Sequence, residues 1–154
     1  MMIYSIKNID ITTEQVANAV LELQLTAYAV EAQLINFSAL PPLQDTVPTL
    51  QRCGETFYGY EIDGVLSGVI SYKKEAGVLD IHRLFVHPQQ FKKGIAGRLL
   101  QFVLTHEQNF HTAIVATAAK NSPAIHFYLR HGFVETTRRE VAEGLEIVQF
   151  HIQP

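Results

Sequence analysis

Hydrophobic and polar positions recur with different spacings along the chain, and each change of spacing marks a new predicted element. After the opening run MMIYSIKNID, which reads as a short strand, apolar residues follow helical spacing: Val16, Val20, Leu23, Ala27 and Val30. Thr12 with Gln15 has the spacing of a capping box at the start of this run. The pattern predicts an amphipathic helix. In residues 36–51, prolines then interrupt helical continuity and predict a short helix or a loop.

Three β-rich runs follow, separated by two turns. The runs TFYGYEI and VLSGVISY flank Asp63-Gly64, a pair that readily supplies the positive φ angles of a tight hairpin turn. A second turn at residues 75–77 leads into VLDIHRLFV, which ends near Pro88. This order predicts three antiparallel strands in a meander.

Helical spacing returns after Gly94. The apolar positions with this spacing are Ile95, Leu99, Phe102 and Val103, and His106 lies at the edge of the pattern. The short apolar run TAIVAT comes next and reads as a buried strand. A strand, a helix and a buried strand in this order predict a parallel pair of strands.

The last third of the chain predicts one more helix and a closing hairpin. In NSPAIHFYLRHG, Ser122 can cap the helix, Pro123 fits its first position, and Gly132 can close its C-terminus. The tail folds around Glu143-Gly144 into two strands. One face of the final strand carries Val148, Phe150 and Ile152.

Composition narrows the class of protein. Of the 154 residues, 47% are hydrophobic and 18% are charged, which suits one globular domain over residues 1–154. A net charge of -3 supplies no general field for nucleic acid or an anionic membrane, so any anion site must be local. Cys53 is the single cysteine, and no stretch approaches the roughly 20 apolar residues of a membrane span. We therefore expect a cytoplasmic protein without a disulfide framework.

The turn from Phe91 to Gly97 carries the first candidate chemistry. A strand that turns through QFKKGIAG into a helix points unpaired backbone N–H groups beyond the helix start, which favours an anion. Gly94 lets the backbone approach a phosphate closely. Positive charge comes from Lys92, Lys93 and Arg98. The same sequence also fits an ordinary solvated turn, and it lacks the P-loop and the three-glycine dinucleotide fingerprint.

Two motifs together resemble the GNAT superfamily of N-acetyltransferases. The family's acetyl-CoA motif, Q/R-x-x-G-x-G/A after a strand reading L-x-V-x-P, is matched by Leu84, Val86, Pro88, Gly94 and Ala96. Its second motif, N-x-x-A-x-x-F-Y-x-x-x-G-F, is matched by Asn121, Ala124, Phe127, Tyr128, Gly132 and Phe133. Phe91 departs from the family, which usually has Gln or Arg there. The resemblance covers nearly the whole chain, because the predicted element order agrees with the family as well.

The resemblance implies a fold, a cosubstrate and a set of site residues. The implied fold is α+β, with a mixed, mostly antiparallel twisted sheet of about seven strands, about four flanking helices and a splay between the fourth and fifth strands. Acetyl-CoA would be the acyl donor, and its pantetheine arm would pair with the backbone of Leu84, Phe85 and Val86. Its pyrophosphate would lie at Lys92, Lys93, Gly94, Ile95, Ala96, Gly97 and Arg98. Asn121 would contact the cofactor arm, and Tyr128 would lie near the sulfur and donate a proton to the leaving thiolate.

The resemblance points less directly to a base. Asp80 stands on the same strand, and at the same distance before Gly94, as a catalytic carboxylate of some family members. His82 shares its strand face if no bulge intervenes, and an imidazole suits proton transfer near neutral pH. Glu61 is a third candidate, and water is a fourth. The other carboxylates that would attract a cationic amine read as ordinary solvated residues: Glu31, Asp45 and Glu55.

The leading interpretation is an acyl-CoA N-acetyltransferase that moves the acetyl group directly to an amine in a ternary complex. A non-catalytic acyl-CoA sensor or interaction module on the same fold is the alternative, because Phe91 departs from the motif and the base is unassigned. Scattered histidines without HExxH spacing predict no metal. The acceptor is open among polyamines, amino acids, antibiotics and protein N-termini. Apolar residues in the final hairpin would permit a homodimer through an edge strand.

Overall fold

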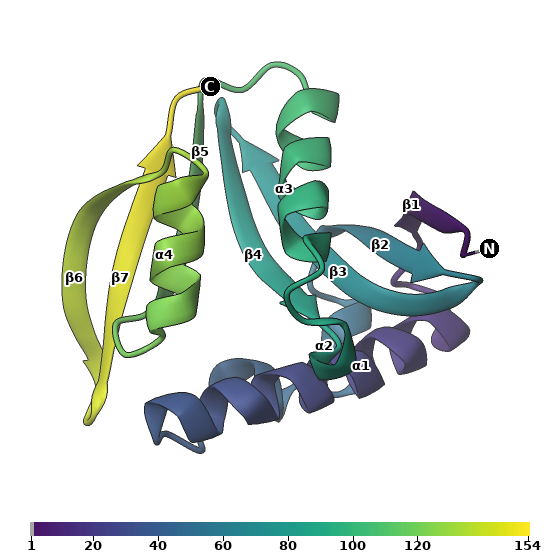
Figure 1. Ribbon diagram of the computed structural model, residues 1–154, viewed down its shortest axis with the longest axis horizontal. Helices are drawn as coiled ribbons and strands as arrows, with labels where there is room; N and C mark the ends of the chain where they lie inside the picture. Colours follow the sequence, from purple (N-terminus) through teal and green to yellow (C-terminus); the bar gives the residue numbers. More distant parts are fainter. Residues whose placement is uncertain (1) are drawn as a thin grey trace.

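The computed structural model describes residues 2–154, which form one twisted sheet with helices on both faces (Figure 1). The strands are β1 (Tyr4–Ile9), β2 (Thr56–Ile62), β3 (Val65–Glu75), β4 (Val78–Val86), β5 (Thr112–Ala118), β6 (Val134–Ala142) and β7 (Leu145–Ile152). The α-helices are α1 (Glu14–Ile35), α2 (Val47–Gln51), α3 (Ile95–His106) and α4 (Ser122–Arg130), with 3₁₀ turns at Pro41–Gln44 and Pro88–Gln90. The predicted mixed class, strand number and helix number are confirmed. No helix among these residues is long and apolar enough to cross a membrane.

The sheet order is β1-β2-β3-β4-β5-β7-β6, and β4 with β5 is its parallel pair, as predicted. All other neighbouring strands are antiparallel. Asp63 and Gly64 have φ angles of 50° and 80° and close the β2–β3 hairpin. Positive φ at both central residues matches the twist of the flanking strands, which is why this pair predicted the hairpin correctly.

β4 and β5 pair at one end only. Residues 78–81 pair with residues 112–115, whereas β4 continues to Val86 beside β3 and β5 continues to Ala118 beside β7. From His82 and Ala116 onward no ladder joins the two strands, so their facing backbone N–H and C=O groups lack a strand partner. In Figure 1 the strands approach at the top and move apart downward. The predicted splay between the fourth and fifth strands is confirmed.

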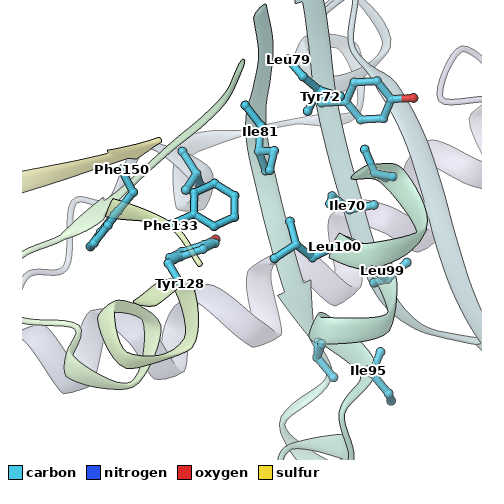
Figure 2. Packing of buried hydrophobic residues seen from close by; sticks show 14 of the residues in the cluster. Ile70, Tyr72, Leu79, Ile81, Ile95, Leu99, Leu100, Tyr128, Phe133 and Phe150 are labelled. Carbon is cyan, nitrogen blue, oxygen red and sulfur yellow. The ribbon is translucent and has the colours of Figure 1, made fainter. Parts of the chain in front are cut away.

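Buried apolar side chains form separate clusters on the two faces of the sheet. The cluster between the sheet and helices α3 and α4 includes Ile70, Ile81, Leu99, Leu100, Tyr128 and Phe133 (Figure 2). The cluster between the sheet and α1 includes Val20, Leu23, Val69 and Phe85. Adjacent β3 residues Val69 and Ile70 enter different clusters because side chains alternate across a strand. Val30, predicted on the apolar face of α1, is exposed instead.

Two predicted helix caps were wrong by one residue. Thr13 rather than Thr12 caps α1, and its hydroxyl accepts the backbone N–H three residues later at 3.3 Å. Asn121 rather than Ser122 caps α4, where its Oδ1 accepts the Ala124 N–H at 3.2 Å. Each site offers two adjacent residues with a capping oxygen, and spacing alone does not show which one stays outside the helix.

β6 is the outer edge of the sheet beyond β7. All nine residues of Val134–Ala142 are exposed. Its ladder with β7 is interrupted twice, between Glu135 and Thr137 and again between Glu140 and Ala142. The predicted turn at residues 143–144 joins the two strands, with Gly144 at a φ of 80°. This edge has no helix over its backbone groups in Figure 1.

Candidate functional site

The start of α3 presents backbone N–H groups without partners. Gly94 is the N-cap residue with a φ of 78°, and no side chain caps the first turn. The first helical hydrogen bond runs from the Arg98 N–H to the Gly94 carbonyl at 3.0 Å. In the part of the chain that the structure describes, the other α-helices are capped by the side chains of Thr13, Thr46 and Asn121. The amides of residues 95–97 are therefore available to a bound anion.

The charged residues of the turn from Phe91 to Gly97 point in different directions. Lys92 is exposed, with a φ of 64°, and Lys93 Nζ donates within the turn to a glutamine side chain at 2.9 Å. The Arg98 guanidinium donates to the Tyr60 hydroxyl at 3.0 Å, which places it beside β2 rather than at the splay. Phe91, which replaces the polar residue of the family motif, is 44% exposed. In this turn, backbone amides and the two lysines are thus the groups available to an anion.

Helix α4 approaches the first turn of α3. A Cβ placed on Gly97 would lie 3.1 Å from His131 Nε2 and 3.9 Å from the Phe127 ring. His131 Nδ1 donates to the Phe127 carbonyl at 2.8 Å, so Nε2 is the nitrogen that faces α3. Glycine at position 97 permits this close approach. The sequence did not single out His131, although it lies inside the second motif.

Tyr128 lies on the same side of the sheet as α3 and is almost fully buried. Its ring packs against Phe133 and Phe150, with centroid distances of 5.5 and 5.8 Å. Figure 2 shows its hydroxyl pointing from α4 toward β4. Within residues 2–154, the Tyr128 hydroxyl forms no hydrogen bond, in contrast to the hydroxyls of Tyr72 and Tyr60. Burial, with Tyr28 and Glu31 nearby, raises the pKa of Tyr128 above its usual value, so the phenol keeps its proton.

Asn121 links α4 to α1. Its Nδ2 donates to Glu31 Oε1 at 2.8 Å, while its Oδ1 caps α4. Burial raises the pKa of Glu31 above its usual value, and the hydrogen bond from Asn121 partly offsets this rise. Tyr28, one turn earlier, packs edge-on against Phe85 of β4 with centroids 5.6 Å apart. The interpretation of Glu31 as an ordinary solvated carboxylate was wrong, and Tyr28 was missed.

We expect Glu31→Gln to stabilise the protein at pH 8 and to have little effect at pH 4. Because the folded pKa is raised, the native state binds more protons than the unfolded state, so stability falls as pH rises from about 4.5 through the folded pKa. The amide oxygen would still accept from Asn121 without carrying a charge. Thermal unfolding at both pH values tests this, with the exposed Glu22→Gln of the same helix as the control. A larger gain at pH 4 than at pH 8 would contradict it.

Asp80 and His82 lie on β4 where its ladder to β5 ends. Asp80 pairs with Ile114, and the last pair follows one residue later. The β3–β4 register shifts at this point and leaves His82 without a partner residue, as in a β-bulge. The bulge that would have separated the two side chains is therefore present. They meet nevertheless, with His82 Nε2 3.3 Å from Asp80 Oδ2.

Arg83, the next residue of β4, is the centre of a buried polar cluster. Its guanidinium lies 2.9 Å from Glu55 Oε1 and 3.2 Å from Asp45 Oδ2, and its Nε donates to Gln24 Oε1 at 3.2 Å. Ser71 Oγ donates to the same Glu55 oxygen at 2.6 Å. The side chains of Arg83 and Glu55 are only 12% and 5% exposed, so the interpretation of Asp45 and Glu55 as solvated carboxylates was wrong. The missed signal was Gln24, a polar residue at a core position of α1.

A depression of about 320 Å³ opens beside Asp80. It is lined by Lys73, Glu75, Ala76, Val78, Asp80 and Ile114. Glu61, the third candidate base, pairs with Lys7 at 3.1 Å on the β1–β2 ladder, away from this depression. Among the described side chains no group of His, Cys, Asp and Glu residues is arranged to hold a metal ion.

Comparison with known proteins finds a matching family model and a related sequence. The family model described as "Acetyltransferase (GNAT) domain" matches residues 43–154. The UPF0157 protein YqkA of Bacillus subtilis (strain 168) is 41% identical over 139 residues, which cover 90% of this chain. The match spans 40% of the length of that relative.

Solved structures share the fold over nearly the full chain. The ribosomal-protein-S18-alanine N-acetyltransferase from Escherichia coli superposes with a TM-score of 0.78 at 16% identity, covering 98% of this chain and 94% of its own. The PaiA N-acetyltransferase from Thermoplasma acidophilum, solved in complex with coenzyme A, has a TM-score of 0.74 at 15% identity, covering 96% and 98%. At these identities the likeness concerns the fold.

Proposed function

Because the chain belongs to the GNAT acetyltransferase family, we propose that it transfers the acetyl group of acetyl-CoA directly to an amine of a second substrate. One observation carries the proposal. The uncapped start of α3 and the buried phenol of Tyr128 lie on the same face of the sheet, beside the splay of β4 and β5. An anion site, an unpaired strand edge and a proton donor are the three parts that binding and cleaving an acyl thioester require.

The residues of the splay fit the donor substrate. Leu84, Phe85 and Val86 lie on β4 beyond its last pair with β5, so their backbone faces the opening and would pair with the pantetheine arm. The amides of the α3 turn would hold the pyrophosphate. At Gly94, a Cβ would have no atom of the chain within 4 Å, so the space beside this glycine is open to a phosphate. Asn121 would act on the donor arm from the N-terminus of α4.

The two faces of the sheet would receive different substrates. The donor site lies on the α3 and α4 face, whereas Arg83, Glu55 and Asp45 join β4 to the segments on the α1 side. The amine would therefore approach from the α1 side, near Asp80 and His82, and meet the thioester through the splay. An ammonium must lose a proton before it attacks, and the departing thiolate must gain one. Tyr128 would supply the second proton, and one member of the Asp80–His82 pair would receive the first.

A thiol-release assay tests the proposal. The purified chain is incubated with acetyl-CoA and a panel of primary amines that includes spermidine, benzylamine and glycinamide, and free thiol is measured. Amine-dependent release of coenzyme A is expected for at least one member. Saturable binding of coenzyme A with no amine-dependent release would contradict transfer to these amines and favour a non-catalytic acyl-CoA sensor.

Gly94→Ala is expected to weaken coenzyme A binding about tenfold, equivalent to about 1.4 kcal/mol. A methyl group at this position enters the space assigned to the pyrophosphate. It also strains the backbone by about 1–2 kcal/mol, because the φ of 78° lies in the left-handed region. Gly64→Ala is the matched control, since Gly64 has a φ of 80° and equally open surroundings but lies at the β2–β3 turn. Calorimetry with coenzyme A should show weaker binding for the first variant alone; equal affinities would contradict the site.

A further inference from the structure

His82 occupies a distinctive place on β4. It is the residue that the β3–β4 register skips, and it directly follows Ile81, the last residue of β4 that pairs with β5. A bulge re-aims one side chain of a strand and interrupts the ladder locally. The imidazole is therefore fixed at the point where the splay opens, next to the depression that Asp80 lines.

The two ring nitrogens of His82 face different carboxylates. Nδ1 is 3.4 Å from Glu55 Oε2, and Nε2 is 3.3 Å from Asp80 Oδ2. Glu55 is 5% exposed, and its other oxygen is held by Arg83 and Ser71. Asp80 is 47% exposed. The imidazole thus has a fixed, buried acceptor on one side and a solvent-accessible carboxylate on the other.

The contacts of the two nitrogens favour Nε2 as the one available to a substrate. A histidine whose Nδ1–H donates to a carboxylate keeps its lone pair on Nε2. Glu55 cannot rotate away from Nδ1 without breaking its bonds to Arg83 and Ser71. Asp80 is the solvent-accessible carboxylate of the two, so an ammonium group of the acceptor would enter on the Nε2 side and bind between Asp80 and Nε2.

We propose that His82 is the proton acceptor of the reaction, that Asp80 binds the ammonium of the acceptor, and that Glu55 positions the imidazole. The inference deepens the proposed function and rests on it. Nε2 takes one proton from the bound ammonium, and the freed nitrogen lone pair forms the N–C bond to the acyl carbon as the C–S bond breaks. The thiolate takes a proton from Tyr128, and the attacking nitrogen releases its surplus proton and keeps one N–H as the amide. Of this proton and the one held by His82, one restores Tyr128 and the other leaves to solvent past the exposed Asp80.

The charged groups around His82 come from several elements. Asp80 is on its own strand, Glu55 precedes β2, and Lys73 of β3 pairs with Asp80 in the register. Arg83 acts through Glu55. On α1, Tyr28 lies near Arg83 and Glu55, with Glu31 beside it. These are the charged groups against which the pH profile of a His82 variant is to be interpreted.

The first test compares His82→Gln with His126→Gln, a histidine exposed on α4. At pH 7, His82→Gln should lower kcat/KM for the amine probes roughly 100-fold, the scale of general base catalysis, and leave the Kd for coenzyme A unchanged. The loss should shrink toward pH 10, where the probe amine deprotonates without help. His126→Gln should match the wild type throughout. Asp80→Asn should raise KM roughly two- to fivefold with kcat nearly unchanged, as for an exposed ion pair.

The second test uses nitrogen-15 NMR of the histidine rings in the free protein. Wild-type His82 should carry its proton on Nδ1 when neutral, and Glu55→Gln should alter that nitrogen shift while His126 stays the same. A neutral His82 with its proton on Nε2, or a His82→Gln variant with the kcat/KM and pH profile of the wild type, would overturn this inference alone. No amine-dependent thiol release from the wild-type chain would overturn the proposed function and this inference with it.

Discussion

Tyr128→Phe should lower kcat about 100-fold or more, the scale of general acid catalysis, while the affinity for coenzyme A changes little. The substitution keeps the ring that packs on Phe133 and Phe150 and removes only the hydroxyl. That hydroxyl has no hydrogen bond to another group of residues 2–154, so its loss leaves no buried partner unsatisfied. The folded protein should therefore keep its Tm and its donor site. Only the protonation of the departing thiolate should be affected.

The pH dependence sharpens this expectation. Burial raises the pKa of Tyr128 above the usual range, so the phenol stays protonated over the whole working range of the assay. The wild-type rate should not fall at high pH because of this residue, and the ratio of wild-type to variant kcat should stay constant between pH 6 and pH 9. Tyr4→Phe, on the exposed strand β1, is the control. A variant with wild-type kcat, or one that loses coenzyme A binding in parallel, would contradict the role of Tyr128 as acid.

Arg83→Met should lower the free energy of unfolding by about 3–5 kcal/mol, because it leaves two carboxylates in a buried site without their cation. Asp45 and Glu55 are 17% and 5% exposed, and Gln24 loses the donor to its carbonyl oxygen at the same time. For a chain of this size the loss corresponds to roughly 10 °C or more in Tm. Thermal or urea unfolding measures it directly.

An arginine of the same sheet provides the matched control for this experiment. Arg138 on β6 pairs with Glu135 at 2.7 Å, but both side chains are more than 40% exposed. Water screens an exposed pair and solvates the carboxylate that remains, so Arg138→Met should cost at most about 1 kcal/mol. Equal losses for the two variants would show that burial of the Arg83 cluster does not determine its contribution.

Local signals in the sequence predicted the elements well because each depends on neighbouring residues. Asp63-Gly64 closed its hairpin, and the helical spacing after Gly94 gave α3. The order of strand, helix and buried strand gave the parallel pair, because parallel neighbours need a long crossover connection and a helix commonly supplies it. The two capping errors have the opposite cause: adjacent residues with equal capping ability differ only in backbone conformation, which local sequence does not determine.

The polar part of the site could not be read from the sequence, because its members come from distant segments. Gln24, Asp45, Glu55 and Arg83 lie on α1, before α2, before β2 and on β4, and only the folded chain joins them. Spacing therefore suggested solvated carboxylates where the structure has a buried ion cluster. The bulge at His82 was equally hidden, since a one-residue shift in strand register leaves no local signature here. The candidate residues of the donor site could be named from the sequence because their motifs are contiguous.

The irregular outer strand β6 affects how readily the protein aggregates. A regular, flat sheet edge offers evenly spaced N–H and C=O groups to any other extended chain, and such edges nucleate aggregation. The two register shifts of β6 break that spacing, and its outward side chains include Glu135, Arg138, Arg139 and Glu140. A foreign strand that added here would have to desolvate these charges and match an irregular ladder. The edge can thus remain in water without a covering helix, and the sheet is protected against uncontrolled extension into fibrils.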